Sequence, residues 1–134
     1  MEGIVLFNKP PGKTSAEITN YFKKLTKKKV GHGGTLDPVA QGLLIIGIGK
    51  YTKELTKFLK ESRKTYIAKI VLGAVSDTYD SEGKIVATGK PIPKFSEIEK
   101  FLKSFVGEIE QTPPPYSAIK IQGKRASDLI REGK

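Results

Sequence analysis

The chain has 134 residues, with 24 lysines and arginines against 14 aspartates and glutamates, and its formal net charge is +10. This length suits one domain, and 37% hydrophobic residues suffice for a packed core. The absence of cysteine excludes disulfide scaffolds, thiol catalysis and cysteine-ligated zinc sites. No apolar run approaches the ~20 residues of a membrane span, and the N-terminus lacks a signal-peptide pattern. We therefore expect a soluble, cytoplasmic, basic domain.

The N-terminal half alternates strand and helix patterns. Residues 3–8 predict a strand, and residues 31–42 break every periodicity and predict a loop. Residues 42–49 form an apolar run bounded by glycines, which predicts a buried strand. Two helices are predicted between and after these segments. The first begins with a Thr14–Glu17 capping box, and its apolar residues at helical spacing are Ile18, Tyr21, Phe22 and Leu25. The second is predicted from the apolar residues Tyr51, Leu55, Phe58 and Leu59.

The C-terminal half predicts shorter elements. Residues 65–72 are β-branched and aromatic, which favours a strand, and residues 76–84 have turn chemistry. Ser96 and Glu99 predict a second capping box at the start of a helix. Three further elements are predicted: a stiff extended segment at residues 112–115, a strand at residues 116–122 and a last helix from near Ala126. Because this order lacks a strict βαβ rhythm, we expect an α/β or α+β domain with a mixed sheet.

The positive charge is typical of proteins that bind polyanions such as nucleic acids. Lysines number 21 and arginines 3, which favours phosphate contacts over base-specific readout. The densest run lies at the end of the first predicted helix, at residues 23–24 and 27–29. Cations at that end also offset the helix dipole, so the run has a structural interpretation as well. Nucleic-acid binding and general solubility both remain open.

The predicted loop holds the only histidine, three glycines and an aspartate that is fixed by a following proline. Glycines permit close backbone approach to a ligand, and Pro38 restricts the direction of the Asp37 carboxylate. A loop with these constraints is a candidate active site. The alternative is structural, with Asp37 capping a turn and His32 satisfied within the loop.

Five ordered motifs span nearly the whole chain. The central one is GHGGTLDPVAQGL at residues 31–43. The others are NKPPGKTS (8–15), Lys64-Thr65-Tyr66, LGAVSDTYDSEG (72–83) and QTPPPYSAIK (111–120) followed by Gly123-Lys124-Arg125. Together these motifs resemble those of the TruB-type tRNA pseudouridine synthases. The resemblance implies the pseudouridine synthase fold, with a mixed, largely antiparallel sheet flanked by helices.

The resemblance also implies the activity, which is isomerisation of the T-loop uridine at position 55 of tRNA to pseudouridine, with base flipping. No cofactor or metal is implied, and the implied partner is the tRNA T-arm, with a monomeric protein and no membrane. Asp37 matches the nucleophile, Tyr66 the residue that stacks on the target base, and His32 the residue that fills the gap it leaves. Four further residues are expected at the substrate. Thr35 and Leu36 shape the pocket, and Lys9 and Lys64 support structure or phosphate contacts.

Residues 1–134 match the N-terminal portion of the family's catalytic domain. The resemblance implies that the domain continues beyond this portion, with an arginine that pairs with the nucleophile, and that an RNA-binding domain often follows. We therefore expect this chain alone to be inactive. The alternative function is a non-catalytic RNA-binding or RNA-chaperone module that keeps the loop only as a scaffold.

Overall fold

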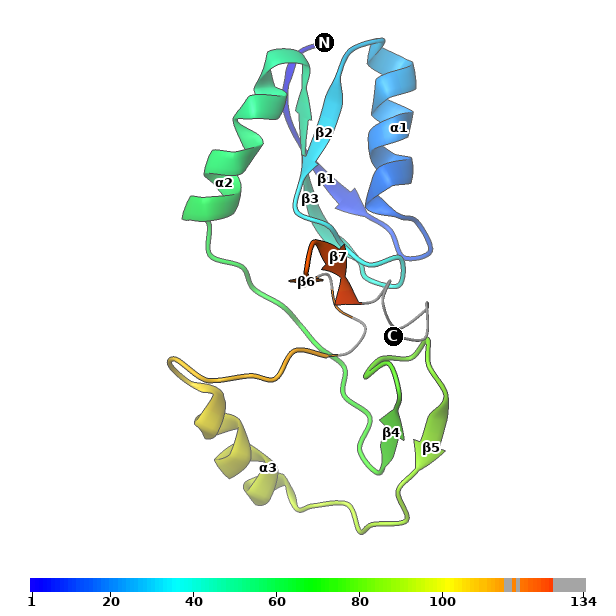
Figure 1. The fold of residues 1–134 in the computed structure, drawn as a ribbon, viewed down its shortest axis with the longest axis vertical. Coiled ribbons are helices and arrows are strands. Elements are labelled where there is room, and N and C mark those ends of the chain that lie inside the picture. The colour runs from blue at the N-terminus through cyan, green and yellow to red at the C-terminus, as the bar shows by residue number, and fades with distance from the viewer. Residues whose placement is uncertain (115–116, 118, 127–134) are drawn as a thin grey trace. The chain divides into compact units, whose positions relative to one another are not determined.

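The computed structural model describes residues 1–114, 117 and 119–126. The chain divides into two compact units, Met1–Tyr66 and Ile67–Lys134 (Figure 1). Helices and antiparallel strand pairs make up both units, and every strand pairing in the described ranges is antiparallel. The expected fold class of helices with largely antiparallel sheets is confirmed. In this part of the chain, no helix has both the length and the apolar character that a membrane span requires.

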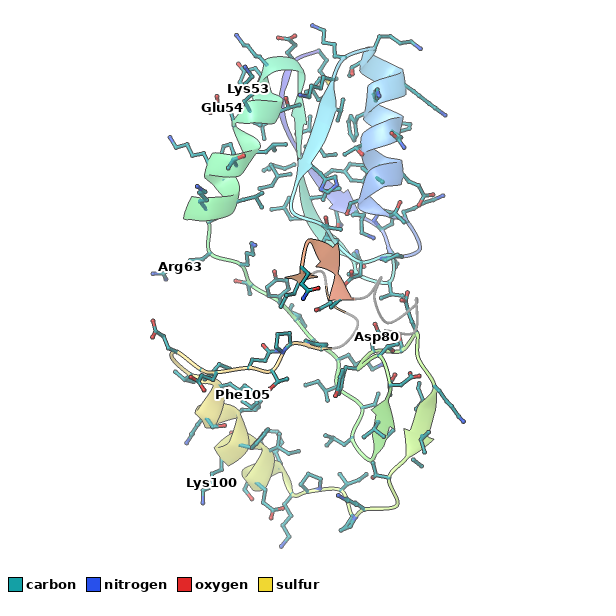
Figure 2. All side chains as sticks on the ribbon, in the orientation of Figure 1. Lys53, Glu54, Arg63, Asp80, Lys100 and Phe105 are labelled. Carbon is teal, nitrogen blue, oxygen red and sulfur yellow. The ribbon has the colours of Figure 1, made fainter. Side chains whose placement is uncertain are left out.

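The first unit is a three-stranded sheet with a helix on each face. Its strands pair in the order β1-β3-β2, so that β3 is central. In chain order, the elements are β1 (Gly3–Lys9), α1 (Ser15–Thr26), β2 (Val30–Gly33), β3 (Gly42–Ile48), the 3-10 helix η1 (Gly49–Lys53) and α2 (Leu55–Glu61). Figure 2 labels Lys53 and Glu54 at the junction between η1 and α2. The predicted strands at residues 3–8 and 42–49 and both predicted helices are confirmed.

The hydrophobic core lies between α1 and one face of the sheet. Alternate residues of a strand point to the same face, and Leu44, Ile46 and Ile48 of β3 are buried there against Ile18 and Phe22 of α1. The ring of Phe7, which is opposite Leu44 in the sheet, meets Phe22 edge to face with centroids 5.6 Å apart. Each fully buried side chain of this kind contributes about 1.5–3 kcal/mol. Tyr21 and Leu25 are each 60% exposed, so the predicted apolar stripe of α1 is wrong at these two residues.

Three glycines lie on the opposite face of the sheet, where η1 and α2 pack. Gly31 and Gly33 of β2 lie against Leu55 of α2, whose methyl carbons would be 3.4 and 3.5 Å from added Cβ atoms. Gly47 of β3 meets the backbone of η1 in the same way, with the Tyr51 carbonyl oxygen only 2.7 Å from an added Cβ. Because these glycines have no side chains, η1 and the Leu55 side chain of α2 pack directly against the backbone of the sheet.

The prediction of a loop over residues 31–42 is wrong for its first part. Residues 31–33 belong to β2 and pair with β3, with His32 opposite Ile46. The period-two pattern of this strand is hidden from sequence because Gly31 and Gly33 are the residues that face α2. The loop proper therefore covers residues 34–41.

The second unit contains short elements: β4 (Ala74–Ser76), β5 (Ile85–Ala87), α3 (Phe95–Leu102), the 3-10 helix η2 (Lys103–Phe105), β6 (Lys120–Ile121) and β7 (Lys124–Arg125). The turn predicted at residues 76–84 is confirmed, because it joins β4 to β5 as a hairpin. Asp77 and Asp80, the latter labelled in Figure 2, accept hydrogen bonds within this turn from the backbone N–H groups of Lys84 and Glu82.

Several predictions for the C-terminal half need correction. Residues 65–72 form no strand, since no partner strand among the described residues supplies the hydrogen bonds that their β-propensity would need. The Ser96–Glu99 capping box is also wrong, because Glu97 instead accepts a bond of 2.7 Å from the Lys94 backbone N–H. The strand predicted at 116–122 is confined to β6, and the last predicted helix lies, beyond Ala126, outside the described residues. Residues 112–114 have no regular secondary structure, and Pro115 is also outside them.

The contact between Gly47 and η1 predicts an unequal pair of alanine variants. Gly47→Ala places its Cβ 2.7 Å from the Tyr51 oxygen and 3.0 Å from the Thr52 Cα, and backbone cannot yield as a side chain can. We expect a loss of about 1–3 kcal/mol in the free energy of unfolding. Gly31, the residue paired with Gly47, is the matched control, because its Cβ would meet only side-chain atoms, those of Leu55 at 3.4 Å and of Thr52 at 3.8 Å or more. Equal losses in urea denaturation would contradict this account.

Candidate active site

The loop at residues 34–41, named here the Asp37 loop, connects β2 to β3. It lies at the end of the sheet where β1 ends at Lys9, because Lys9 pairs with Gly42, the first residue of β3. The connection between β1 and α1, residues 10–14, begins at the same end. Two loops that are far apart in sequence therefore meet beside Asp37.

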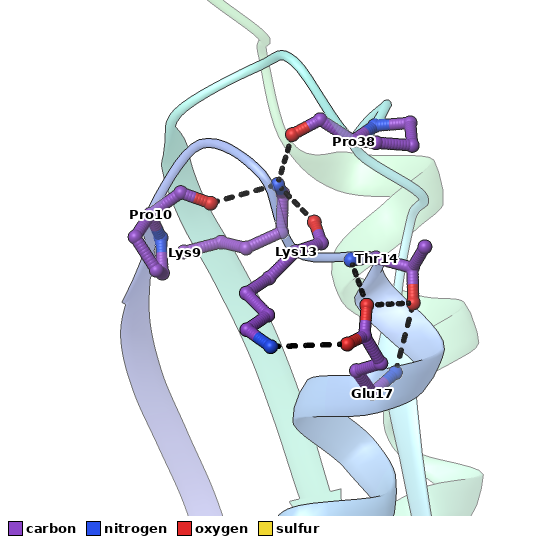
Figure 3. Close-up of polar contacts among 6 residues, drawn as sticks. All are labelled: Lys9, Pro10, Lys13, Thr14, Glu17 and Pro38. Atoms are coloured by element: carbon purple, nitrogen blue, oxygen red, sulfur yellow. Dashed lines mark hydrogen bonds and ion pairs between the residues drawn. The ribbon is translucent and has the colours of Figure 1, made fainter.

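The Lys9 ammonium group joins these two loops (Figure 3). Its Nζ donates to the carbonyl oxygens of Pro10 at 3.0 Å, Lys13 at 2.5 Å and Pro38 at 3.3 Å. An ammonium group has three N–H donors, so each donor has one acceptor. The side chain is 0% exposed and lies on the face of the sheet that carries Val5 and Phe7. Its methylene stem thus continues the core, and its charged end fixes the loops.

Further hydrogen bonds hold the residues on both sides of Asp37. The Pro38 carbonyl oxygen accepts a second bond, of 2.8 Å, from the backbone N–H of Gly12. On the other side, the Ser15 hydroxyl accepts from the Leu36 N–H at 3.0 Å and donates to the Leu36 carbonyl oxygen at 3.1 Å. Ser15 is 2% exposed, so these bonds are shielded from water. The backbone is therefore anchored at both neighbours of Asp37.

Asp37 itself begins a β-turn and is exposed. Its carbonyl oxygen accepts a bond of 3.0 Å from the Ala40 N–H, and Pro38 occupies the second turn position, which its fixed φ favours. In the described ranges, the Asp37 carboxylate has neither a hydrogen-bond partner nor an ion-pair partner. Only the backbone of Asp37 therefore serves the turn, and its carboxylate is open to a ligand.

His32 lies on the core face of β2 and is half-buried. Its Nδ1 is 2.5 Å from the Gly34 carbonyl oxygen. A carbonyl oxygen only accepts, so Nδ1 carries the proton in this bond, and Nε2 is the ring nitrogen that remains for another partner. The bond fixes the imidazole at the start of the Asp37 loop.

The other predicted site residues lie in three settings. Leu36 packs against the core, and Thr35 is exposed beside it. Tyr66, 75% exposed, and Lys64 lie in the segment after α2, and no hydrogen bond or ion pair within the described residues joins either to the Asp37 loop. Lys9 was predicted to support structure or phosphate contacts at the substrate, and its buried ammonium group contacts loop carbonyls.

Ser15 is a site-forming residue that the sequence analysis did not single out. The capping pattern drew attention to Thr14, whose hydroxyl accepts from the Glu17 N–H at 3.1 Å. Ser15 follows it directly, at the first position of α1, and its hydroxyl turns toward the Asp37 loop. No local pattern distinguishes these two roles, because the partner of Ser15 is 21 residues away.

The predicted Thr14–Glu17 capping box is confirmed and lies beside the Lys9 network (Figure 3). The Glu17 carboxylate accepts from the Thr14 backbone N–H at 2.8 Å and from the Thr14 hydroxyl at 2.9 Å, and Lys13 pairs with it at 3.2 Å. These contacts, the backbone bond first, lower the pKa of Glu17 from its ordinary 4.5 to about 2. The box fixes the start of α1 and thereby the position of Ser15.

Comparison with known proteins assigns the family. Residues 23–134 match the "TruB family pseudouridylate synthase (N terminal domain)". The chain belongs to this family. The tRNA pseudouridine synthase B of Clostridium acetobutylicum is 48% identical, over 99% of this chain and 46% of the relative. That of Aquifex aeolicus is 47% identical, over 100% and 47%. The chain thus spans about half the length of these curated relatives.

More distant proteins support the same assignment. The tRNA pseudouridine synthase 4 of Schizosaccharomyces pombe is 40% identical, over 98% of this chain and 39% of the relative. A chain in a crystal structure of a Cbf5–Nop10–Gar1 complex is 29% identical, with a TM-score of 0.58 over 88% of this chain and 31% of that one. The predicted membership of the TruB family is confirmed.

The Lys9 network predicts a structural cost for removing one ammonium group from this TruB-family chain. Lys9→Met keeps the apolar stem and removes the ammonium donor from three carbonyl oxygens, of which, among the residues that the structure describes, only that of Pro38 keeps a second donor, the Gly12 N–H. We expect the free energy of unfolding to fall by about 1–3 kcal/mol, measured by urea denaturation. Lys13→Met is the control, because the Lys13 side chain is 57% exposed and makes only a surface ion pair. Equal stability of the two variants would show that the network does not hold the loops.

The capping box predicts the titration of Glu17. Because its folded pKa of about 2 lies below 4.5, the ionised carboxylate stabilises the start of α1 above pH 4.5, and this stabilisation is lost as the pH falls from 4.5 to 2. Thr14→Val removes the hydroxyl bond and keeps the backbone bond, so the pKa should rise. NMR titration of the Glu17 side-chain carbon measures both values. A wild-type value near 4.5 would contradict the geometry.

Proposed function

We propose that the protein converts the uridine at T-loop position 55 of tRNA to pseudouridine, with Asp37 as the nucleophile. The observation that carries this proposal is the contrast within the Asp37 loop, where an anchored backbone presents an exposed carboxylate. Family membership supports the reaction, because the relatives are named tRNA pseudouridine synthases.

The reaction breaks the N-glycosidic bond of one uridine and forms a carbon–carbon bond between the same ribose and base. It is an isomerisation, so no group is gained or lost overall and no co-substrate is consumed. A carboxylate suits such a step, because it attacks, forms a covalent intermediate and then leaves. Attack on the ribose or on the pyrimidine is equally compatible with an exposed Asp37. Anchoring of Leu36 and Pro38 gives the proposal its physical basis, since a prepositioned nucleophile lowers the entropic part of the barrier.

The target base must leave its stack before it can reach Asp37. Base flipping costs a few kcal/mol, and aromatic side chains offset part of this cost by stacking. We assign Tyr66, whose ring is largely exposed, to stacking on the flipped uracil, and His32 to the gap that it leaves. Thr35 and Leu36 then shape the pocket beside the carboxylate.

The two motif lysines receive different roles in this proposal. Lys9 positions Asp37 through the Pro38 carbonyl and does not touch the RNA, because its ammonium group is buried. Lys64 is exposed and is assigned to phosphate contacts with the T-arm. The proposed enzyme acts as a monomer in the cytoplasm.

An Asp37→Asn variant of the full-length protein tests the proposal. The amide has nearly the same shape but is not a nucleophile, so turnover should fall by about 10⁴-fold or more while RNA affinity changes little. The substrate is a T-arm RNA with tritium at uracil C5, which is released when that carbon joins the ribose. An RNA with cytidine at the target position reports on specificity, and Asp80→Asn, in the hairpin turn of the second unit, is the matched control.

The outcomes separate the candidate functions. Release by the wild type and by Asp80→Asn, and not by Asp37→Asn, supports the proposal. Unchanged release by Asp37→Asn would show that another group is the nucleophile. RNA binding by the wild type without any release would instead favour the non-catalytic RNA-binding or RNA-chaperone module.

A further inference from the structure

A groove of about 780 Å³ lies at the C-terminal end of α1 and along its connection to β2. We name it the lysine groove after the residues that line it: Asn20, Lys23, Lys24, Lys27, Lys28 and Lys29. All five lysines are exposed. Within the described residues, the only ion pair they make joins Lys28 to Glu2 at 2.7 Å. The groove therefore collects positive charge that the described part of the chain neutralises at one position only.

Helix stability explains part of this cluster. Cations in the last turn of a helix offset its dipole, and Lys23 and Lys24 lie in the last turn of α1. Lys28 and Lys29 lie beyond the helix end, where this effect fades within a turn. The dipole therefore does not account for the lysines of the connection.

Lys27 is the most informative residue of the groove. It ends α1 in the left-handed conformation, with φ 56° and ψ 24°, and its N–H donates to the Lys23 carbonyl oxygen at 2.9 Å. This position favours glycine or asparagine, because a side chain with a Cβ is strained there. A lysine at this position costs backbone stability and adds charge to the groove. We infer that position 27 carries a lysine, in spite of this strain, because of the charge that it adds to the groove.

The lysine groove lies at the C-terminal end of α1. The Asp37 loop lies beside the other end of this helix, where the backbone of Leu36 bonds to Ser15, and Figure 1 shows the two ends of α1. The helix has 12 residues and is therefore about 18 Å long. The chain then runs back from the groove to the Asp37 loop through β2, which starts after the groove and ends at that loop. One nucleotide does not span this separation, so a phosphate in the groove belongs to a different part of the RNA from a base at Asp37.

We propose that the lysine groove binds the phosphate backbone of the substrate RNA, away from the target nucleotide. The proposal rests on the function proposed above and adds a second contact surface to it. Lysines act as point charges toward phosphates and read no base sequence, which fits a surface with five lysines and no arginine. The groove thus supplies affinity and orientation, and the Asp37 loop supplies chemistry.

The test compares two triple variants of the full-length protein with equal changes in net charge. The groove variant is Lys23→Gln, Lys24→Gln and Lys27→Gly. The control is Lys53→Gln, Lys57→Gln and Lys60→Gln, which removes three exposed lysines from η1 and α2. The probe is an unmodified tRNA transcript, and the readouts are its affinity at several salt concentrations and the KM and kcat of tritium release.

We expect the groove variant to bind more weakly than the control and to show a higher KM with unchanged kcat. Each lost phosphate contact lowers the salt slope by about 0.9, so over 50–200 mM salt the wild type should lose about 40-fold more affinity than the variant. Lys27→Gly alone should weaken binding while its melting temperature stays equal or rises. A purely structural lysine would give the opposite pattern, with lower stability and unchanged binding.

Each result decides one of the two proposals. Equal affinities of the groove and control variants, with wild-type turnover intact, would overturn the groove and leave the proposed function standing. Loss of binding in the groove variant, with wild-type binding but no turnover, would support the groove and overturn the function. Absence of tRNA binding by the wild type would overturn both proposals. A groove that prefers a polyanion other than RNA, such as heparin, would overturn the groove proposal alone.

Discussion

The buried ammonium group of Lys9 is the interaction on which the geometry of the site depends. Three carbonyl oxygens from two loops converge on it, and one of them belongs to Pro38, the residue after Asp37. Desolvating a charge is costly unless every donor is satisfied, and here each N–H has an acceptor. Because the same Pro38 oxygen also accepts from Gly12, the Asp37 loop cannot shift without breaking bonds to both the end of β1 and the start of the α1 connection.

The strand β2 has a different packing role on each face of the first sheet. On one face, β2 contributes Val30 to the core and places His32 beside the Asp37 loop. On the other face, Gly31 and Gly33 leave room for Leu55, so α2 packs directly on the backbone. The four residues of β2 thus make room for Leu55, complete the core and orient an imidazole. This dual use explains why the strand looks irregular in sequence although its alternation is strict.

Local patterns predicted the elements whose signal is complete within the segment. The Thr14–Glu17 box was predicted correctly because its two residues are three apart, and β3 because its apolar run is continuous, although its partner strand β1 is distant in sequence. The same reasoning failed where the deciding partner is distant or missing from the pattern. Residues 31–33 needed β3 to become a strand, and residues 65–72 lack a partner strand in the described ranges. At the site, motif resemblance predicts a role for Asp37, but only the fold shows that Ser15 and Lys9 fix its neighbours.

The bonds around Asp37 fix the position of its carboxylate but do not change the reactivity of that group. The bonds that anchor both neighbours of Asp37 act on backbone atoms of Leu36 and Pro38, and none within the described residues acts on the Asp37 carboxylate. Backbone anchoring fixes where the carboxylate is but does not desolvate it, and a solvated carboxylate is a weak nucleophile. A bound nucleotide would exclude water from the carboxylate as it closes over the loop. Under the proposed function, substrate binding and activation of the nucleophile are then a single event. Contacts far from Asp37 that hold the RNA in place raise the fraction of enzyme in this closed complex and leave the chemical step within it unchanged.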